Sequence, residues 1–242
     1  MELSIVIPAF DESKKIAHDI GAAAEFLSAH KFAGEIIVVD DGSSDNTANI
    51  ARQAAGQMPE GVTCTVICSE ENAGKGNAVK RGFAGSTCEY VLFADCGCCV
   101  PYENVLDGLE LLANDHCDIA HASRKLPQTK ITTPQTLYRR VCSWLFHLVV
   151  MHITKIPPHL TDTQCGFKIY KGDIGRKLYA ECITDGFMFD VEIILLAVKG
   201  HYRIEEFAIE WVCDLDSRLS LTRTPWPVLA ELWRIKRKHA KE

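Results

Sequence analysis

No stretch of the 242-residue sequence is long and apolar enough to form a membrane-spanning helix. Such a helix needs about 20 consecutive apolar residues, whereas the longest candidate, residues 141–153, is short and contains His147 and His152. The start of the chain also lacks the basic segment of a secretory signal peptide, and Pro8 interrupts its apolar run. These absences predict a cytoplasmic protein.

A general excess of basic residues is missing too. The formal net charge is −6, which argues against a nucleic-acid-binding surface. Basic residues gather at two places, Arg139-Arg140 and the tail at 233–241. A helix predicted over 136–153 either packs on the sheet or lies among lipid headgroups, and the tail is either solvated or close to anionic lipid. The second alternative in each case predicts peripheral association with the cytosolic face of a membrane.

The eleven cysteines lack the spacing of a disulfide framework or a zinc site. Their number is odd, and Cys96, Cys98 and Cys99 contain no C-x2-C pair of the kind that zinc sites use. Thiolates are also poor ligands for a cation that must contact phosphate oxygens. We therefore interpret the cysteines as reduced thiols, and residues 96–99 as a packed turn.

Two common nucleotide-binding motifs are absent. No G-x-G-x-x-G follows the first predicted strand, which disfavours a dinucleotide-binding fold, and residues 72–77 (NAGKGN) lack Walker A spacing. A Gly-Lys-Gly sequence remains there at a predicted helix start, where backbone N–H groups and Lys75 can meet a diphosphate. A plain surface turn is the alternative. A nucleotidyltransferase would need a glycine-rich loop where this chain has residues 9–12, AFDE.

Short apolar runs alternate with helical patterns along the first half of the chain. This alternation predicts an α/β fold with a mostly parallel sheet flanked by helices. The predicted strands are 3–8, 35–40, 62–69, 89–95 and 117–123, and the predicted helices are 12–29, 46–55, 74–85 and 102–115. The second half is less regular, with the 136–153 helix, a polar loop at 161–170, a helix at 186–200, a strand at 202–212 and a tail helix at 226–240.

Acidic residues follow the predicted strands, at 11–12, 40–41, 70–71 and 95. Ligands of open α/β sheets bind at the carboxyl ends of the strands, so these acids describe a site on one rim. The adjacent carboxylates Asp40 and Asp41 repel each other unless they meet donors or a cation. We assign them to a ligand, and Ser44 or Asp45 to the cap of the following helix.

Taken in order, these pieces resemble the family 2 glycosyltransferases of the GT-A fold. The matching segments are IPAFDE (7–12), VVDDGSSDNT (38–47), NAGKGNAV (72–79) and the strand ending at Asp95. The segments ASR (122–124), DTQCGFKIY (162–170) and FDVEIILLA (189–197) look like the dolichyl-phosphate and polyprenyl-phosphate branch. The resemblance implies a single domain over 1–242, with a nucleotide-sugar-binding half at 1–123, an acceptor-side half at 124–212 and a tail helix at 213–242.

The resemblance also implies roles for individual residues. Nucleotide-sugar contacts would come from Pro8, Ala9, Asp11, Glu12, Asp40, Asp41, Lys75 and Asp95. Asp95 would also hold Mg²⁺ or Mn²⁺ beneath the donor diphosphate. Acceptor contacts would come from Arg124, Arg139, Arg140, Gln164 and Glu192, the arginines by bidentate contact with a phosphate. The candidate catalytic residues are Asp95, Asp162 and Asp190.

One position departs from the family pattern. The family's Asp-x-Asp motif reads Asp95-Cys96-Gly97 here, so the second acid is missing. Asp95 then holds the cation with donor phosphates, water and another side chain such as Asp162, because Mg²⁺ needs only one or two carboxylates. Two alternatives stay open: metal-free catalysis with Lys75 and arginines at the leaving group, or a nucleotide-sugar-binding protein with impaired turnover.

The resemblance implies an inverting enzyme that moves a hexose, by expectation glucose, from a UDP-sugar to a polyprenyl phosphate. A phosphate acceptor is already ionised and needs no general base. A soluble saccharide, small-molecule or protein acceptor is the alternative, and a hydroxyl acceptor would need a carboxylate base. Asp162 and Asp190 are the candidates for that base.

Overall fold

The computed structural model describes residues 1–133, 150, 154, 156–212 and 225–239. The strands are β1 Glu2–Ala9, β2 Ala33–Asp40, β3 Val62–Cys68, β4 Tyr90–Ala94, β5 Ile119–Ser123, β6 Lys130–Thr133, β7 Phe167–Lys171, β8 Ile204–Ala208 and β9 Glu210–Val212. The helices are α1 Ile16–Ala29, α2 Thr47–Ala55, α3 Lys75–Gly85, α4 Val105–Ala113, α6 Gly172–Glu181, α7 Phe189–Lys199 and α8 Pro225–His239, and a 3-10 turn covers Tyr102–Asn104.

The main sheet has seven strands in the order β3-β2-β1-β4-β7-β5-β8. Strands β1 to β4 pair in parallel, as does β5 with β8. Only β7 runs antiparallel to its neighbours β4 and β5 in this sheet. The predicted α/β fold with a mostly parallel sheet is confirmed.

Strand β7 corrects one prediction. Residues 161–170 were expected to form a polar loop, but Phe167–Lys171 is a central strand with four of its five residues buried. Lys168 made the segment look solvent-exposed; its side chain is instead buried against a carboxylate. A charged residue in a buried strand interrupts the apolar pattern by which strands are predicted, and the sequence does not show its distant partner.

The predicted strand over 202–212 is also wrong as a single element. It divides at Ile209 into β8, the edge of the main sheet, and β9, which pairs in parallel with β6 in a second sheet. Lys130 N donates to Ile209 O, so the dividing residue starts the second sheet. Val212 N donates to Cys99 O, which ties β9 to the turn after β4.

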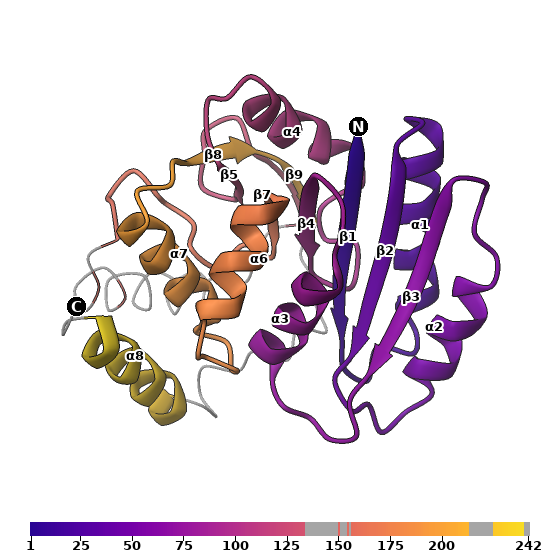
Figure 1. Cartoon of the computed structure of the whole chain (residues 1–242), viewed down its shortest axis with the longest axis horizontal. Helices are drawn as coiled ribbons and strands as arrows, with labels where there is room; N and C mark the ends of the chain where they lie inside the picture. The colour runs from indigo at the N-terminus through magenta and orange to yellow at the C-terminus, as the bar shows by residue number, and fades with distance from the viewer. Residues whose placement is uncertain (134–149, 151–153, 155, 213–224, 240–242) are drawn as a thin grey trace.

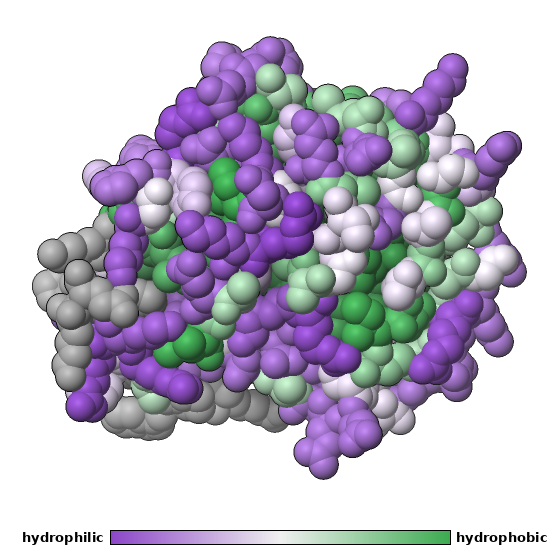
Figure 2. Space-filling view, in the orientation of Figure 1, coloured by the Kyte–Doolittle hydropathy of each residue, from purple (hydrophilic) through white to green (hydrophobic). Residues whose placement is uncertain are grey.

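Helices cover both faces of the main sheet (Figure 1). One apolar cluster joins the sheet to α1, α2 and α4, and a second joins it to α3, α6, α7 and α8. Strands β1 and β4 read as continuous apolar runs because both of their faces are buried. Edge strand β3 is only partly buried. In Figure 2 a hydrophobic area lies over β2 and β3 beside α3, where helix cover is thinner.

The predicted tail helix is present as α8, whereas the predicted helix over 136–153 falls almost wholly outside the described residues. Within the ranges that the structure describes, no helix combines the length and apolar character needed to cross a bilayer.

Candidate active site

The predicted rim forms where the parallel strands end. Asp40 is the last residue of β2, and Asp95 follows the last residue of β4. Lys75 is the first residue of α3, whose amino end lies at the same edge of the sheet (Figure 1). This edge therefore brings a strand-end carboxylate and a helix-start cation together, as the sequence predicted.

Lys75 and Asp95 form the centre of the site. Lys75 Nζ lies 2.6 Å from Asp95 Oδ1, and the two side chains are 25% and 36% exposed. Nζ also lies 5.4 Å from the centroid of the Phe93 ring, a cation–π distance. Burial alone would lower the pKa of Lys75, but the charges of Asp95 and Asp190 outweigh it and raise that pKa. Lys75 is thus held as a cation at the mouth of the site.

Gly166 leaves the space that the Asp95 carboxylate fills. Asp95 N donates to Gly166 O at 2.8 Å, and a Cβ atom on Gly166 would collide with the Asp95 carboxylate. The glycine of the DTQCGFK segment therefore has a steric role at this point.

Asp190 and Lys168 form a buried ion pair beside the centre. Both side chains are almost fully buried, and Lys168 Nζ also donates to Thr163 O at 3.1 Å. Burial raises the pKa of Asp190 even though Lys168 and Lys75 act in the opposite direction. Negative and positive groups thus alternate from Asp95 through Lys75 and Asp190 to Lys168.

Asp162 is committed to Arg124. The guanidinium donates from Nε to Oδ2 at 2.6 Å and from Nη2 to Oδ1 at 2.8 Å, and the backbone N–H of Arg124 adds a third bond. Burial would raise the pKa of Asp162, but the Arg124 charge and these hydrogen bonds lower it to about 2. The pair is bidentate, and the Asp162 side chain is almost fully buried. Gln164 follows in the same loop, its N–H 3.4 Å from Asp162 Oδ1.

The predicted nucleotide-side acids mostly organise loops. Asp11 accepts hydrogen bonds from Ser44 N and Oγ and from Asp45 N. Ser43 Oγ donates to Asp40 and accepts from Asp11 N. Beside them, Pro8 and Ala9 pair with β2, and Glu12 N donates to Thr47 Oγ1. These bonds hold the two strand-end loops against each other at the carboxyl edge of the sheet.

Asp41 is attached to the start of α3. It accepts hydrogen bonds from Ala73 N at 3.1 Å and from Gly74 N at 2.8 Å, and it is buried. Gly74 has φ +104°, a conformation that L side chains rarely adopt. Asp41 thereby fixes the turn that presents Lys75.

Residues 184–186 pack directly on this turn. A Cβ on Gly74 would lie 2.5 Å from Asp185 O, and one on Gly76 would lie 2.6 Å from Thr184 O. Both glycines therefore make room for protein backbone. Glu192 holds the same segment, because its Oε2 accepts from Ile183 N and Thr184 N. Glu192 is fully buried there, and its predicted contact with the acceptor stays a prediction.

The turn after Asp95 wraps around a carboxylate that the sequence analysis did not single out. Asp19 of α1 is fully buried and accepts hydrogen bonds from Gly97 N, Cys98 N and the thiols of Cys96 and Cys98. Gly97 has φ +113° and Cys98 φ +46°. Cys96, Cys98 and Cys99 form no disulfide, and the described part of the chain holds no group of three or more His, Cys, Asp or Glu suited to a metal.

At the centre of the site, Asp95 offers a carboxylate to a hard cation, next to Lys75. Its Oδ1 accepts no hydrogen bond of good geometry from the described residues, although Lys75 lies beside it. One carboxylate is sufficient for Mg²⁺ or Mn²⁺ when donor phosphates and water complete the shell. Both carboxylate oxygens of Asp162 accept hydrogen bonds from Arg124, and the predicted role of Asp162 as a second ligand stays a prediction. Arg139 and Arg140 lie outside the described residues.

Two residues of this site escaped the sequence analysis, Lys168 and Asp19. Each left a signal: Lys168 lies within the DTQCGFKIY segment, and Asp19 falls three residues after Ile16 on the apolar face of a predicted helix. A charged residue on a buried face implies a buried partner, but the sequence does not say which.

Comparison with known proteins identifies the family. Residues 4–179 match the sequence model of glycosyl transferase family 2. The chain belongs to this family. It is therefore a glycosyltransferase. The acids of the rim and Lys75 lie within the matched region.

Two curated relatives share most of the chain. The dolichyl-phosphate β-glucosyltransferase of Dictyostelium discoideum is 28% identical, covering 97% of this chain and 77% of the relative. The enzyme of the same name from Saccharomyces cerevisiae is 31% identical, covering 86% of this chain and 66% of the relative. This chain therefore spans about two thirds to three quarters of the length of these relatives.

A solved structure shows the same fold. Glucosyl-3-phosphoglycerate synthase from Mycobacterium tuberculosis, in complex with Mn²⁺, UDP-glucose and phosphoglyceric acid, has a TM-score of 0.68 and is 16% identical. The match covers 97% of this chain and 79% of that one. It supports the GT-A assignment of the sheet and its flanking helices.

Proposed function

We propose that the chain transfers glucose from UDP-glucose to a dolichyl-type polyprenyl phosphate, with inversion at the anomeric carbon. The names of the relatives supply the donor sugar and acceptor class. The choice of acceptor rests on one observation: both candidate general bases are engaged in ion pairs. Asp162 is bound by Arg124, and Asp190 is paired with Lys168. A hydroxyl acceptor needs a carboxylate ready to take a proton, whereas an ionised phosphate does not.

Lys75 carries the leaving-group chemistry of this proposal. Bond cleavage at the sugar leaves negative charge on UDP, and a fixed cation stabilises that charge without reorganisation. The Asp41 carboxylate fixes the turn before Lys75, and Asp95 and Asp190 keep it protonated. We assign Pro8, Ala9, Asp11, Glu12 and Asp40 to the wall of the nucleotide pocket.

A divalent cation fits Asp95 once the donor is bound. The Mycobacterium tuberculosis enzyme binds Mn²⁺ together with UDP-glucose, and we propose Mg²⁺ or Mn²⁺ here. The cation would neutralise the donor diphosphate, which is the chemistry that a metal supplies in such sites.

On the acceptor side we propose Arg124, Arg139, Arg140 and Gln164. The pair with Asp162 uses Nε and Nη2 of Arg124, and Nη1 is directed to the acceptor phosphate in this proposal. We place the enzyme on the cytosolic face of a membrane, where such an acceptor is embedded.

The test is an assay with radiolabelled UDP-glucose and dolichyl phosphate in detergent, with Mn²⁺, Mg²⁺ or EDTA. GDP-mannose as donor and a free oligosaccharide as acceptor serve as controls. Label in an organic-phase glycolipid, dependent on dolichyl phosphate, supports the proposal. Label only in the oligosaccharide would replace it with a soluble acceptor, and UDP-glucose binding without turnover would make the chain a binding protein.

A further inference from the structure

Helix α8 has two sharply different sides. Leu232 and Ile235 are fully buried and belong to the cluster that contains α7. Trp233 is 62% exposed, the most exposed of the large apolar side chains in the described residues. At 100° per residue, Trp233 lies about 130° from the middle of the side formed by Leu232 and Ile235, and Arg237 lies almost opposite that middle. The helix therefore packs in one orientation and presents a tryptophan to solvent.

Three cations surround this tryptophan. Arg237 and Lys236 flank Trp233 on the helical wheel, Arg234 lies about 100° away from it, and all four side chains are exposed. The guanidinium carbon of Arg237 lies 5.3 Å from the centroid of the Trp233 ring. We call Trp233, Arg234, Lys236 and Arg237 the outer face of α8. This basic face belongs to a chain with net charge −6, so it is a local feature.

The inner side of α8 is fastened beside the active site. Glu231 Oε2 accepts from Met188 N at 3.2 Å, two residues before Asp190. Lys238 Nζ donates to Glu181 O at 3.2 Å and lies 3.7 Å from Glu192 Oε1. Glu231 and Lys238 thus point inward, which leaves the outer face with one sign of charge. Figure 1 shows α8 beside α7, away from the edge formed by β3.

We propose that the outer face of α8 docks on an anionic lipid bilayer, with Trp233 at the headgroup level. Tryptophan favours the boundary between headgroups and acyl chains, and Lys and Arg side chains are attracted to the negative surface of an anionic membrane. This inference rests on the proposed function, because a polyprenyl phosphate is reached only from the membrane surface. A bilayer contact at α8 brings the start of α7 and its Asp190 close to that surface.

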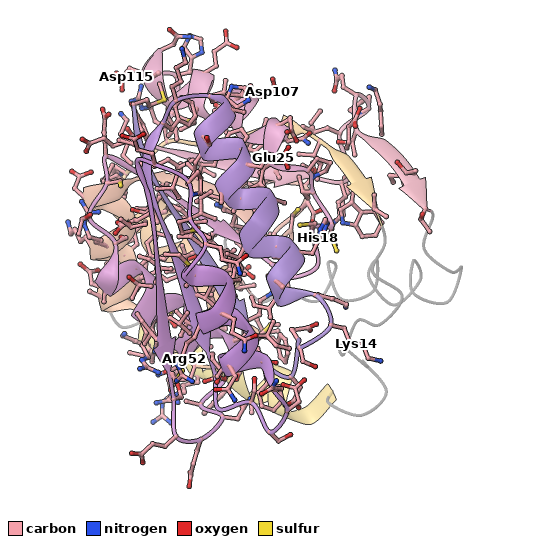
Figure 3. The ribbon with its side chains drawn as sticks, turned by 90° about the vertical axis from the view of Figure 1, so that its right-hand side faces the viewer. Lys14, His18, Glu25, Arg52, Asp107 and Asp115 are labelled. Atoms are coloured by element: carbon pink, nitrogen blue, oxygen red, sulfur yellow. The ribbon has the colours of Figure 1, made fainter. Side chains whose placement is uncertain are left out.

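The test compares matched charge variants in vesicle co-sedimentation. Arg234→Glu/Lys236→Glu/Arg237→Glu reverses the outer face. Lys14→Glu/Lys31→Glu/Arg52→Glu makes the same charge change on exposed residues of the opposite layer, two of which are labelled in Figure 3. On vesicles of 30% phosphatidylserine in phosphatidylcholine, the first variant should lose at least about a hundredfold in partition coefficient, from about 1 kcal/mol per cation. The second should lose far less.

Trp233 gives an independent reading. Brominated phosphatidylcholine mixed into the same vesicles should quench wild-type fluorescence, and Trp233→Phe should remove most of that quenching. Equal losses in the two charge variants, or quenching unchanged by Trp233→Phe, would overturn the proposal. So would retention of the wild type on heparin or RNA without vesicle binding, which would indicate a polyanion-binding face.

Calorimetry with UDP-glucose separates this inference from the proposed function. A wild type that binds UDP-glucose and ignores anionic vesicles refutes the docking face alone. A wild type that binds vesicles through α8 and shows neither UDP-glucose binding nor transfer refutes the proposed function and leaves a lipid-binding face. Both charge variants should bind UDP-glucose like the wild type.

Discussion

Lys75 Nζ and Asp95 Oδ1 lie 2.6 Å apart at the carboxyl edge of the sheet, one from the start of a helix and one from the end of a strand. We expect Lys75→Met to lower kcat for glucose transfer by about 10²- to 10³-fold, the range for removing one stabilising group at a developing anion. Initial rates at saturating donor measure this loss. Lys80→Met is the control, since Lys80 lies on the same helix and pairs with Asp185. Equal losses in the two variants would contradict a specific role for Lys75.

Gly97→Asp restores the second acid of the family's Asp-x-Asp motif. We expect that the new carboxylate does not reach the cation site. Gly97 has φ +113°, a conformation in which an L side chain is strained, and such strain costs about 1–3 kcal/mol. We expect Gly97→Ala to lose the same free energy of unfolding in urea, because the cost is conformational. Neither variant should change the metal concentration that gives half-maximal activity. A tighter metal response in Gly97→Asp alone would show that the turn accepts the acid.

The thiols of Cys96 and Cys98 should react slowly although both are partly exposed. Burial first, and then the negative charge of Asp19, raises the pKa of both thiols far above the ordinary value. Asp19→Asn removes the charge, so more thiolate forms and the rate of iodoacetamide labelling at pH 8 should rise about tenfold or more. The pKa of the Cys64 thiol on β3 is raised by burial, with no part played by Asp19, so Cys64 should label at an unchanged rate.

Lys168 and Asp190 should be strongly coupled. Lys168→Met or Asp190→Asn alone leaves a buried charge or amide without its partner and should cost about 3–5 kcal/mol of unfolding free energy. The double variant should cost less than the sum of the single variants by about 2 kcal/mol. Urea unfolding of the four proteins gives this cycle. Additive losses would show that the buried pair contributes nothing as a pair.

The Arg124–Asp162 pair should make stability depend on acid. Because the pKa of Asp162 falls from 3.8 to about 2 on folding, its contribution is complete above about pH 4 and disappears as the pH falls toward 2. A shift of one pKa unit corresponds to about 1.4 kcal/mol, so this group contributes about 2 kcal/mol to the free energy of unfolding. Unfolding free energies between pH 2.5 and 6 should show this slope. In the double variant Arg124→Met/Asp162→Asn, the unfolding free energy should fall less over this pH range, because the contribution of Asp162 is absent.

The sequence predicts the sheet and the rim well because both follow from local patterns. Strands buried on both faces are uniformly apolar, and the acids that end them are adjacent in the chain to those runs. Lys75 and Asp95 belong to different βα units, yet parallel topology alone brings them to the same edge. Nothing more than the order of elements is needed for that prediction.

The remaining features depend on contacts between distant segments. Strand β7 was missed because the partner of Lys168 lies 22 residues away, on α7. Gly74 and Gly76 suggested phosphate contacts, whereas their missing side chains make room for residues 184–186. Asp41 has the sequence context of a ligand and bonds to the backbone at 73–74. Such pairings are fixed by packing, and no local pattern encodes them.

The position of β7 has a consequence for synthesis of the chain. Among the described strands, β7 pairs with both β4 and β5 and so connects β5 and its neighbour β8 to the rest of the main sheet. Residues 119–123 therefore leave the ribosome about 45 residues before β7, the strand with which they pair. Until residue 171 has emerged, β4 and β5 each have an open backbone edge, and such edges recruit other chains. A nascent chain stalled between these points should be the species most prone to aggregate and most dependent on a chaperone.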